Sequence, residues 1–278
     1  MSPAKTAGGA QPGALYAKSV SHDFIWKVRL THPDRADVRV EWAGRPFVFD
    51  PVDPVEGDRV ILTGAGPDRV RGTAAAVANG MKPDVIADRA ILDWLGGLGP
   101  LGAADLPDCE VDGVRVRSLP YAAPSVARPL THFLKASLGV FRPSRGFGPL
   151  RTARESAGRE PVAGVAPRIW ELALPGAGRL VHLDLALHGE LSPAWLVASA
   201  DFAGADWVIA GCAFGEAEAV ARHLPHFAGK QILVTDLVNG ERRARSLPVE
   251  GITPLRDRLH GLGLPAHVFA TQASYRFE

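Results

Sequence analysis

The segment with the clearest chemical content is residues 62–73, LTGAGPDRVRGT, which lies between an apolar run and a helical pattern. It contains the carboxylate of Asp68, followed directly by the guanidinium of Arg69. A carboxylate can ligate a divalent cation, whereas a guanidinium is permanently positive and repels one. Gly64 and Gly66 contribute no side chain. This loop therefore supplies few of the ligands that a metal site requires.

The same glycines suggest a phosphate-binding loop. However, the string GAGPDRV lacks the Gly-x-Gly-x-x-Gly spacing of a dinucleotide-binding loop. The Lys-Ser/Thr pair of a P-loop is also missing. A phosphate-binding loop is therefore disfavoured.

Acidic and histidine side chains elsewhere make the best case for a residual metal site. His182 and Asp184 alternate along one predicted strand and so point to the same face, and His188 follows closely. A lone histidine on a strand is more often a hydrogen-bonded boundary residue than a ligand. One divalent metal ion thus stays an alternative to no cofactor at all. Its candidate ligands are Asp68, His182, Asp184 and Asp236.

Nucleophilic catalysis has little support in the sequence. No serine stands in a Gly-x-Ser-x-Gly nucleophile elbow. Cys212 follows a predicted strand and precedes a helix, where the pKa of a thiol can be lowered, but His223 and His226 lie well along that helix. A buried free thiol is the simpler interpretation, and no catalytic residue is assigned.

The overall composition suits one globular domain that is soluble and cytoplasmic. The chain has 278 residues, of which 46% are hydrophobic and 22% charged, and its formal net charge is +1. Balanced charge without interleaved aromatic and basic residues argues against a nucleic-acid partner. The most apolar long stretch, residues 195–214, contains Asp201 and Asp206, so no transmembrane segment is expected. Residues 1–21 are expected to form a disordered leader, followed by a single domain at residues 22–278.

Short strands and helices alternate along the rest of the chain. Each half begins with a hairpin and continues with alternating strands and helices, which favours two mixed sheets packed together with helices outside. The expected strands include residues 38–42, 46–50 and 60–63, a hairpin around Asp112 and Gly113, two strands joined by a turn at 175–178, and strands within 205–211, 230–238 and 266–272. The last of these is expected to close the fold. The expected helices lie at residues 71–80, before Gly96 and Gly97, at 216–227 and at 253–263.

Residues 123–168 fit this alternation least well. In this arginine-rich segment, apolar side chains recur at helical spacing: Leu130, Phe133, Leu134, Leu138 and Phe141. One interpretation is an ordinary helix packed over the core beside a solvated basic loop. The other is a lid, or a docking helix that contacts an anionic surface through residues 128–159.

Residues 62–73 resemble the signature of the metallo-β-lactamase superfamily. In that family a strand is followed by Thr-His-x-His-x-Asp-His and a helix, and the loop gathers two metal ions. Here Gly64 and Gly66 stand where the first two histidines are expected. Asp68 matches the aspartate, and Arg69 replaces the last histidine. Three of the four loop ligands are therefore missing.

The resemblance extends over most of the chain. Residues 40–51, VEWAGRPFVFDP, resemble the opening hairpin of the family, which typically ends in Asp-Pro. Residues 114–124 resemble the strand that leads to another metal-binding histidine. Tyr121, Ala122 and Ala123 stand at that place in this chain.

Two later strands also resemble family strands that end in a metal ligand. Residues 178–190 are similar to the strand whose final aspartate bridges both metals; the alignment puts Leu185 there, with Asp184 one place earlier. Residues 230–238 resemble a late strand of the lactonase-like branch that ends in Met-His, and Asp236 falls at the histidine. No aligned position keeps a histidine ligand.

The resemblance implies an α/β fold, a four-layer αββα sandwich of two mixed β-sheets with outer helices. It also implies that this chain is a degenerate member of the superfamily, one that lacks the di-zinc site. Arg69 is then expected to supply positive charge itself and to bridge Asp68 and Asp236 with forked hydrogen bonds. Alternatively, Asp68 only caps the following helix.

Two functions are compatible with these residues. The first is a catalytically degenerate protein whose cleft binds an unknown small molecule or protein. The second is a hydrolase of a phosphate or ester substrate that uses a rearranged single-metal site or no metal. The candidate cleft residues are Gly64, Gly66, Asp68, Arg69, Asp184 and Asp236.

Overall fold

The computed structural model describes residues 28–31, 37–122, 162–188, 190–212, 217–227, 229–235, 252–270 and 273–277, without the side chains of Asp68 and Phe277. Three features predicted from the sequence lie outside these residues. They are the leader at residues 1–21, the apolar stripe with most of its basic surroundings in residues 123–161, and Asp236.

The described strands form two sheets of seven strands each. The first sheet contains β1 (Val28–Thr31), β2 (Val38–Trp42), β3 (Arg45–Phe49), β4 (Arg59–Ile61), β5 (Asp84–Ile86), β6 (Ala104–Asp105) and β14 (Ser274–Phe277). The second sheet contains β7 (Cys109–Val111), β8 (Val114–Pro120), β9 (Arg168–Leu174), β10 (Gly178–Asp184), β11 (Trp207–Gly211), β12 (Gln231–Thr235) and β13 (Ala266–Phe269). Their spatial orders are β14-β1-β2-β3-β4-β5-β6 and β13-β12-β11-β10-β9-β8-β7.

Both sheets are mixed, with an antiparallel and a parallel part. In the first sheet, β14, β1, β2 and β3 pair antiparallel, and β3 to β6 run parallel. In the second sheet, β7 to β10 pair antiparallel, and β10 to β13 run parallel. The antiparallel hairpins come first in each half of the chain, as predicted.

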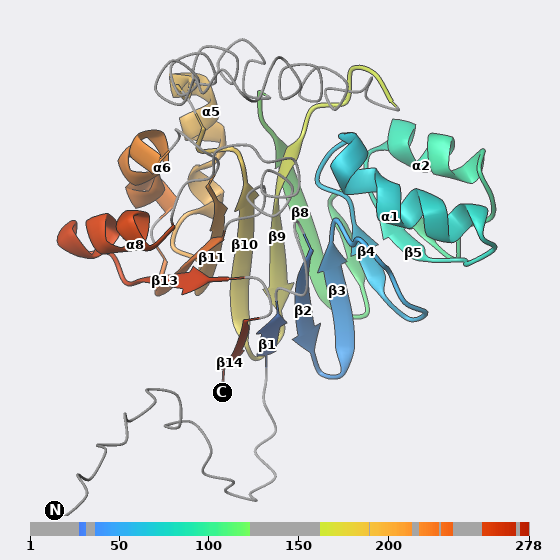
Figure 1. The fold of residues 1–278 in the computed structure, drawn as a ribbon, viewed down its shortest axis with the longest axis horizontal. Helices are drawn as coiled ribbons and strands as arrows, with labels where there is room; N and C mark the ends of the chain where they lie inside the picture. Colours follow the sequence, from blue (N-terminus) through green and yellow to red (C-terminus); the bar gives the residue numbers. More distant parts are fainter. Residues whose placement is uncertain are drawn as a thin grey trace, which may run out of the picture.

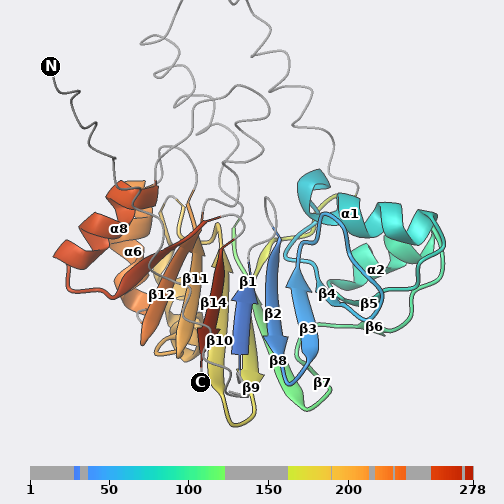
Figure 2. The ribbon, with the colours of Figure 1, turned by 60° about the horizontal axis from the view of Figure 1, so that its bottom comes forward.

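Helices cover the outer face of each sheet (Figures 1 and 2). On the first sheet these are α1 (Pro67–Ala78) and α2 (Arg89–Gly96). On the second they are α5 (Pro193–Ala198), α6 (Ala217–His223) and α8 (Ile252–Gly261), with short 3-10 turns η2 (Ala200–Phe202) and η3 (Leu224–Phe227). Among the described helices, none has the length and apolar character needed to cross a membrane.

Three apolar clusters divide the molecule into layers. The central cluster joins the inner faces of both sheets, with Phe47 and Phe49 from one and Trp170 and Leu172 from the other, all fully buried. A second cluster lies under α1 and α2, and a third lies under the helices of the second sheet. Alternate strand residues therefore face either the inter-sheet core or a helical layer. The predicted four-layer αββα sandwich is confirmed.

Two element predictions need correction. The strand at residues 266–269 does not close the fold, because β14 follows it and pairs antiparallel with β1. The first helix begins at Pro67 instead of residue 71, because Pro67 is pre-organised for the first helical turn and Gly66 provides the N-cap. This earlier start places Arg69 within the helix.

Gly72 allows α1 to touch the loop after β3. A Cβ atom at this position would lie 2.1 Å from the carbonyl oxygen of Pro51 and 2.4 Å from that of Val52. These are backbone atoms, which cannot yield like the end of a side chain. Gly72 therefore sets the distance between the helix that carries Arg69 and the loop that begins at Asp50.

We expect the substitution Gly72→Ala to lower the free energy of unfolding by about 3 kcal/mol, through overpacking against this loop. Gly96→Ala is the matched control, since no atom lies within 4 Å of its Cβ position and alanine favours the helix. Urea denaturation of both variants measures the difference. Equal stabilities would show that the close approach at Gly72 does not constrain the fold.

Candidate functional site

The candidate site lies where strand ends from both sheets meet the first turn of α1. Asp50 directly follows β3 and Thr63 follows the parallel neighbour β4, so the two residues come together at one sheet edge. Asp184 ends β10 of the other sheet. The sheets are tied together nearby, because the backbone N–H of Arg168 donates to the carbonyl oxygen of Thr63 at 2.8 Å.

Arg69 bridges two buried carboxylates from different sheets. Its Nη1 donates to Oδ2 of Asp50 at 2.9 Å, and its Nη2 donates to Oδ1 of Asp184 at 2.8 Å. Nη1 also contacts the hydroxyl of Thr63. The side chain of Arg69 is 11% exposed, and those of Asp50 and Asp184 are 2% and 1% exposed. One guanidinium is thus shared by two acids that have almost no contact with solvent.

The remaining oxygens of these acids are also engaged. The backbone N–H of Thr63 donates to Oδ1 of Asp50 at 2.8 Å, and the Thr63 hydroxyl lies 2.5 Å from Oδ2. The phenol of Tyr121 donates to Oδ2 of Asp184. Because the charges are paired and hydrogen-bonded, the cost of burying them is partly offset.

Backbone geometry aims both acids at Arg69. Asp50 and Asp184 have φ of +46° and +49°, a left-handed conformation that aspartate tolerates better than most residues. The register of β10 against β11 shifts between His182 and Asp184, which is a bulge at the strand end. Asp184, and not its neighbour Leu185, is therefore the residue that contacts Arg69.

The two acids differ in their affinity for a proton. Burial raises the pKa of Asp50 from 3.8 to about 7, and the negative charge of Asp184 adds to the rise, while Arg69 and Thr63 oppose it. Burial also favours the neutral form of Asp184, but the charges of Arg69 and His182 and the hydrogen bond from Tyr121 together hold its pKa below the ordinary value. Burial raises the pKa of Tyr121 well above its usual range, so the phenol remains a donor. Asp184 thus favours the ionised form that pairs with Arg69, whereas burial favours the protonated form of Asp50.

The described residues do not fit a di-zinc site. No three His, Cys, Asp or Glu side chains among them are grouped so as to hold a metal ion. The guanidinium of Arg69 lies between the two acids. A Cβ atom at Gly64 would lie 3.3 Å from Cβ of Pro167, a tight contact, and 3.5 Å from Cδ of Arg69, so any side chain there would pack directly against the stem of Arg69.

The other residues predicted to belong to the site lie at several different positions in the fold. Gly66 is the N-cap of α1, and Asp68 lies in the first turn of that helix. His182 is buried between the sheets, with its ring stacked on Phe49 at 4.5 Å between centroids. His188 lies with Nε2 3.3 Å from the carbonyl oxygen of Gly211. The predicted bridge from Arg69 to Asp68 and Asp236 stays a prediction, because neither acidic side chain is described.

Sequence reasoning assigned no site role to Asp50, Thr63 or Tyr121. The sequence marks Asp50 only as the end of an Asp-Pro hairpin, and Tyr121 only as a residue in place of a histidine. The Asp-Pro step at the end of a strand was the one signal that marked Asp50. Thr63 carried none, because a threonine at the end of an apolar strand is common.

Solved structures resemble this chain, whereas neither protein-family models nor curated proteins match it. Igni18, a metallo hydrolase from the hyperthermophilic archaeon Ignicoccus hospitalis, shares 12% identity over 90% of this chain and 98% of its own, with a TM-score of 0.58. The isothiocyanate hydrolase from Delia radicum gut bacteria shares 15% identity over 90% of this chain and 99% of its own, with a TM-score of 0.57. CmlA, a diiron β-hydroxylase from Streptomyces venezuelae, matches over 91% of this chain and 54% of its own, at 12% identity and a TM-score of 0.55.

The chain has the metallo-β-lactamase fold. At these identities the likeness establishes the fold alone. Within the metallo-β-lactamase fold, the resemblance noted in the sequence puts metal ligands on the loop after β4 and at the end of β10. In this chain those two segments contribute Arg69 and Asp184 to an internal ion pair.

We expect Arg69→Met to lower the free energy of unfolding by about 3–5 kcal/mol, because it leaves the charge of Asp184 buried without a counter-ion. Adding Asp184→Asn to that variant removes the unpaired charge and should recover part of the loss. Arg71→Met, at an exposed position of the same helix, is the control and should change stability by less than about 0.5 kcal/mol. A double variant that is no more stable than Arg69→Met would mean that packing, not charge, explains the loss.

The raised pKa of Asp50 predicts a pH dependence of stability. The folded chain binds a proton here that the unfolded chain releases between pH 3.8 and about 7, so stability falls as pH rises through that window. We expect the free energy of unfolding to drop by on the order of 2 kcal/mol from pH 5 to pH 8, beyond any change seen in Asp50→Asn. Asn also accepts the left-handed backbone at this position. Parallel pH profiles for the two proteins would refute this assignment.

Proposed function

We propose that this chain is a catalytically degenerate metallo-β-lactamase-fold protein that binds a ligand or a partner without di-zinc chemistry. The observation that carries this proposal is the Arg69 bridge between Asp50 and Asp184. A divalent cation at this place would have to displace a guanidinium that is fixed by two carboxylates and a hydroxyl. It would also meet the repulsion of that guanidinium at close range.

The energetics of the bridge support a positioning role. A buried ion pair gains little net stability over a well-packed apolar cluster, but breaking it is costly. The Arg69 bridge joins α1 to the end of β10 in the opposite sheet, so it holds the strand-end loops in one arrangement. A fixed set of loops at the edge of a sandwich is a suitable frame for recognition.

The main alternative is a hydrolase of a phosphate or ester that works without metal. It is favoured by the opposite pKa shifts of the two acids, because a protonated Asp50 beside an ionised Asp184 resembles a general acid and base. Against it stands their burial, because carboxylates that are 2% and 1% exposed do not reach a substrate. Contact with an anionic surface through residues 128–159 and the cytoplasmic location stay predictions.

Metal analysis of the purified chain tests the proposal. We expect far less than one zinc, manganese or iron per chain, and no change in Tm between excess zinc and a chelator. A bound metal at a thousandfold excess over its Kd would add about 4 kcal/mol of stability. Stoichiometric metal that is lost in Asp184→Asn would overturn the proposal.

Turnover of bis(p-nitrophenyl) phosphate and p-nitrophenyl acetate separates the two functions. We expect no activity above background in the presence of a chelator. Activity that is lost in both Asp50→Asn and Asp184→Asn, with folding retained, would establish the metal-free hydrolase instead. Arg71→Gln serves as the control for nonspecific effects of substitution, because Arg71 is exposed on α1.

A further inference from the structure

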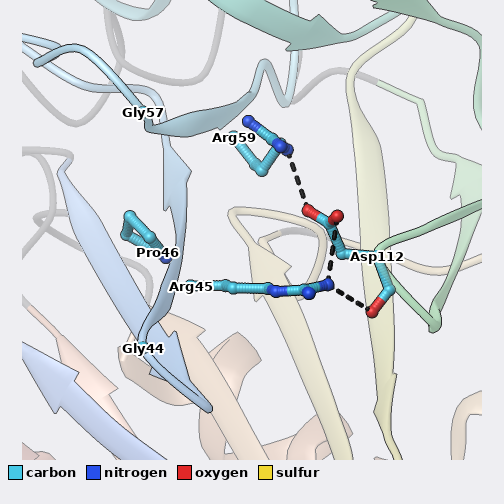
Figure 3. Close-up of a pocket in the computed structure, with 6 residues that line it drawn as sticks. All are labelled: Gly44, Arg45, Pro46, Gly57, Arg59 and Asp112. Atoms are coloured by element: carbon cyan, nitrogen blue, oxygen red, sulfur yellow. Dashed lines mark hydrogen bonds and ion pairs between the residues drawn. The ribbon is translucent and has the colours of Figure 1, made fainter.

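A second polar site lies at the other end of the sandwich. It is a pocket of about 310 Å³, lined by Gly44, Arg45, Pro46, Gly57, Arg59 and Asp112 (Figure 3). Arg45 and Arg59 begin strands β3 and β4, whereas the Arg69 cluster uses the residues that follow these strands. At about 3.3 Å per residue, the two sites are separated by about 15 Å along the sheet.

Two arginines converge on one carboxylate in this pocket. Nη1 of Arg45 donates to the carbonyl oxygen of Asp112 at 2.9 Å and lies 3.0 Å from its Oδ1. Nε of Arg59 donates to Oδ2 of Asp112 at 3.1 Å. The lining side chains carry two positive charges and one negative charge, and the carboxylate of Asp84, which pairs with Arg59, balances the second arginine.

Several arginine donors remain available. Nε and Nη2 of Arg45, and Nη2 of Arg59, have no hydrogen-bond acceptor among the residues that the structure describes. A guanidinium offers its donors as a planar fork that matches the oxygens of a carboxylate or phosphate. These unused donors match the acceptor oxygens of an oxyanion.

The pocket is pre-organised on one side and open on the other. Arg59 is held from behind by Asp84 and is 25% exposed, whereas Arg45 is 49% exposed. Asp112 and Gly113, with φ of +56° and +82°, form a tight hairpin turn that fixes the carboxylate. No atom lies within 4 Å of a Cβ position at Gly44 or Gly57, so these glycines leave room for a ligand.

We propose that this pocket binds a small oxyanion, the phosphate or carboxylate group of a polar ligand. Arg59 is the fixed anchor, and Arg45 is the exposed arm that closes on the ligand. Asp112 holds both guanidinium groups in place when the pocket is empty and repels the incoming anion. A pocket whose lining is charged, glycine or proline suits a polar ligand better than an apolar one.

Titration of inorganic phosphate and, separately, acetate tests the proposal at constant ionic strength. Binding is followed by NMR through the backbone amides of Gly44 and Gly57. We expect saturable shifts in the millimolar range for wild type, and at least a tenfold weaker affinity in Arg45→Gln and Arg59→Gln. Arg71→Gln makes the same charge change at a distant exposed position and should leave the affinity unchanged.

Asp112→Asn separates an oxyanion site from a structural salt bridge. Asparagine keeps the left-handed turn but removes the competing charge, so phosphate should bind about fivefold more tightly. Tighter binding of phosphate than of acetate would assign the site to a phosphate group, and the reverse order to a carboxylate. Absence of saturable shifts in wild type, or equal binding in Arg59→Gln, would overturn the proposal. Unchanged affinity in Asp112→Asn would overturn the role given to Asp112.

Discussion

A single guanidinium lies between two acids that belong to different sheets, and the geometry around it depends on that contact. Arg69 reaches Asp50 on its own side of the sandwich and Asp184 on the other, across 115 residues of sequence. Both carboxylates are buried and the side chain of Arg69 is only 11% exposed, so neither acid can be left without its partner at low cost. The loops after β3, β4 and β10 are held together by this contact.

The close packing of α1 makes the bridge possible. Gly72 lets the helix lie directly on the backbone of residues 51–52, and one turn earlier this brings Arg69 to Asp50. The helix begins at Pro67, which directs Arg69 inward from the first turn. Gly72 and the start of the helix at Pro67 thus position the guanidinium of Arg69, and the ion pairs of Arg69 then hold the strand-end loops together.

In the metallo-β-lactamase fold, strand ends from two sheets converge at one edge of the sandwich. In this chain the guanidinium of Arg69 lies at that edge. Asp50 and Asp184 both pair with Arg69, and their shared environment raises the pKa of Asp50 and lowers that of Asp184. At the opposite end of β3 and β4, Arg45 and Arg59 repeat the combination of arginine and aspartate in a more exposed setting. The two sites differ in burial. The Arg69 cluster has almost no contact with solvent, whereas the pocket of Arg45 and Arg59 is more exposed and keeps hydrogen-bond donors that are not used within the described part of the protein.

Much of the fold was readable from the sequence, because strand alternation, glycine stops and hairpin turns are local signals. They predicted the hairpins and the four layers but not β1 and β14, and the chemistry of glycine and arginine showed that residues 64, 66 and 69 supply no metal ligands. The partners of Arg69 were decided by the tertiary structure alone. Asp50 and Asp184 are distant in sequence, and the bulge that turns Asp184 toward Arg69 leaves no mark in an alternating pattern. Contacts between sheets depend on how strand ends meet in space, and only the folded chain specifies that.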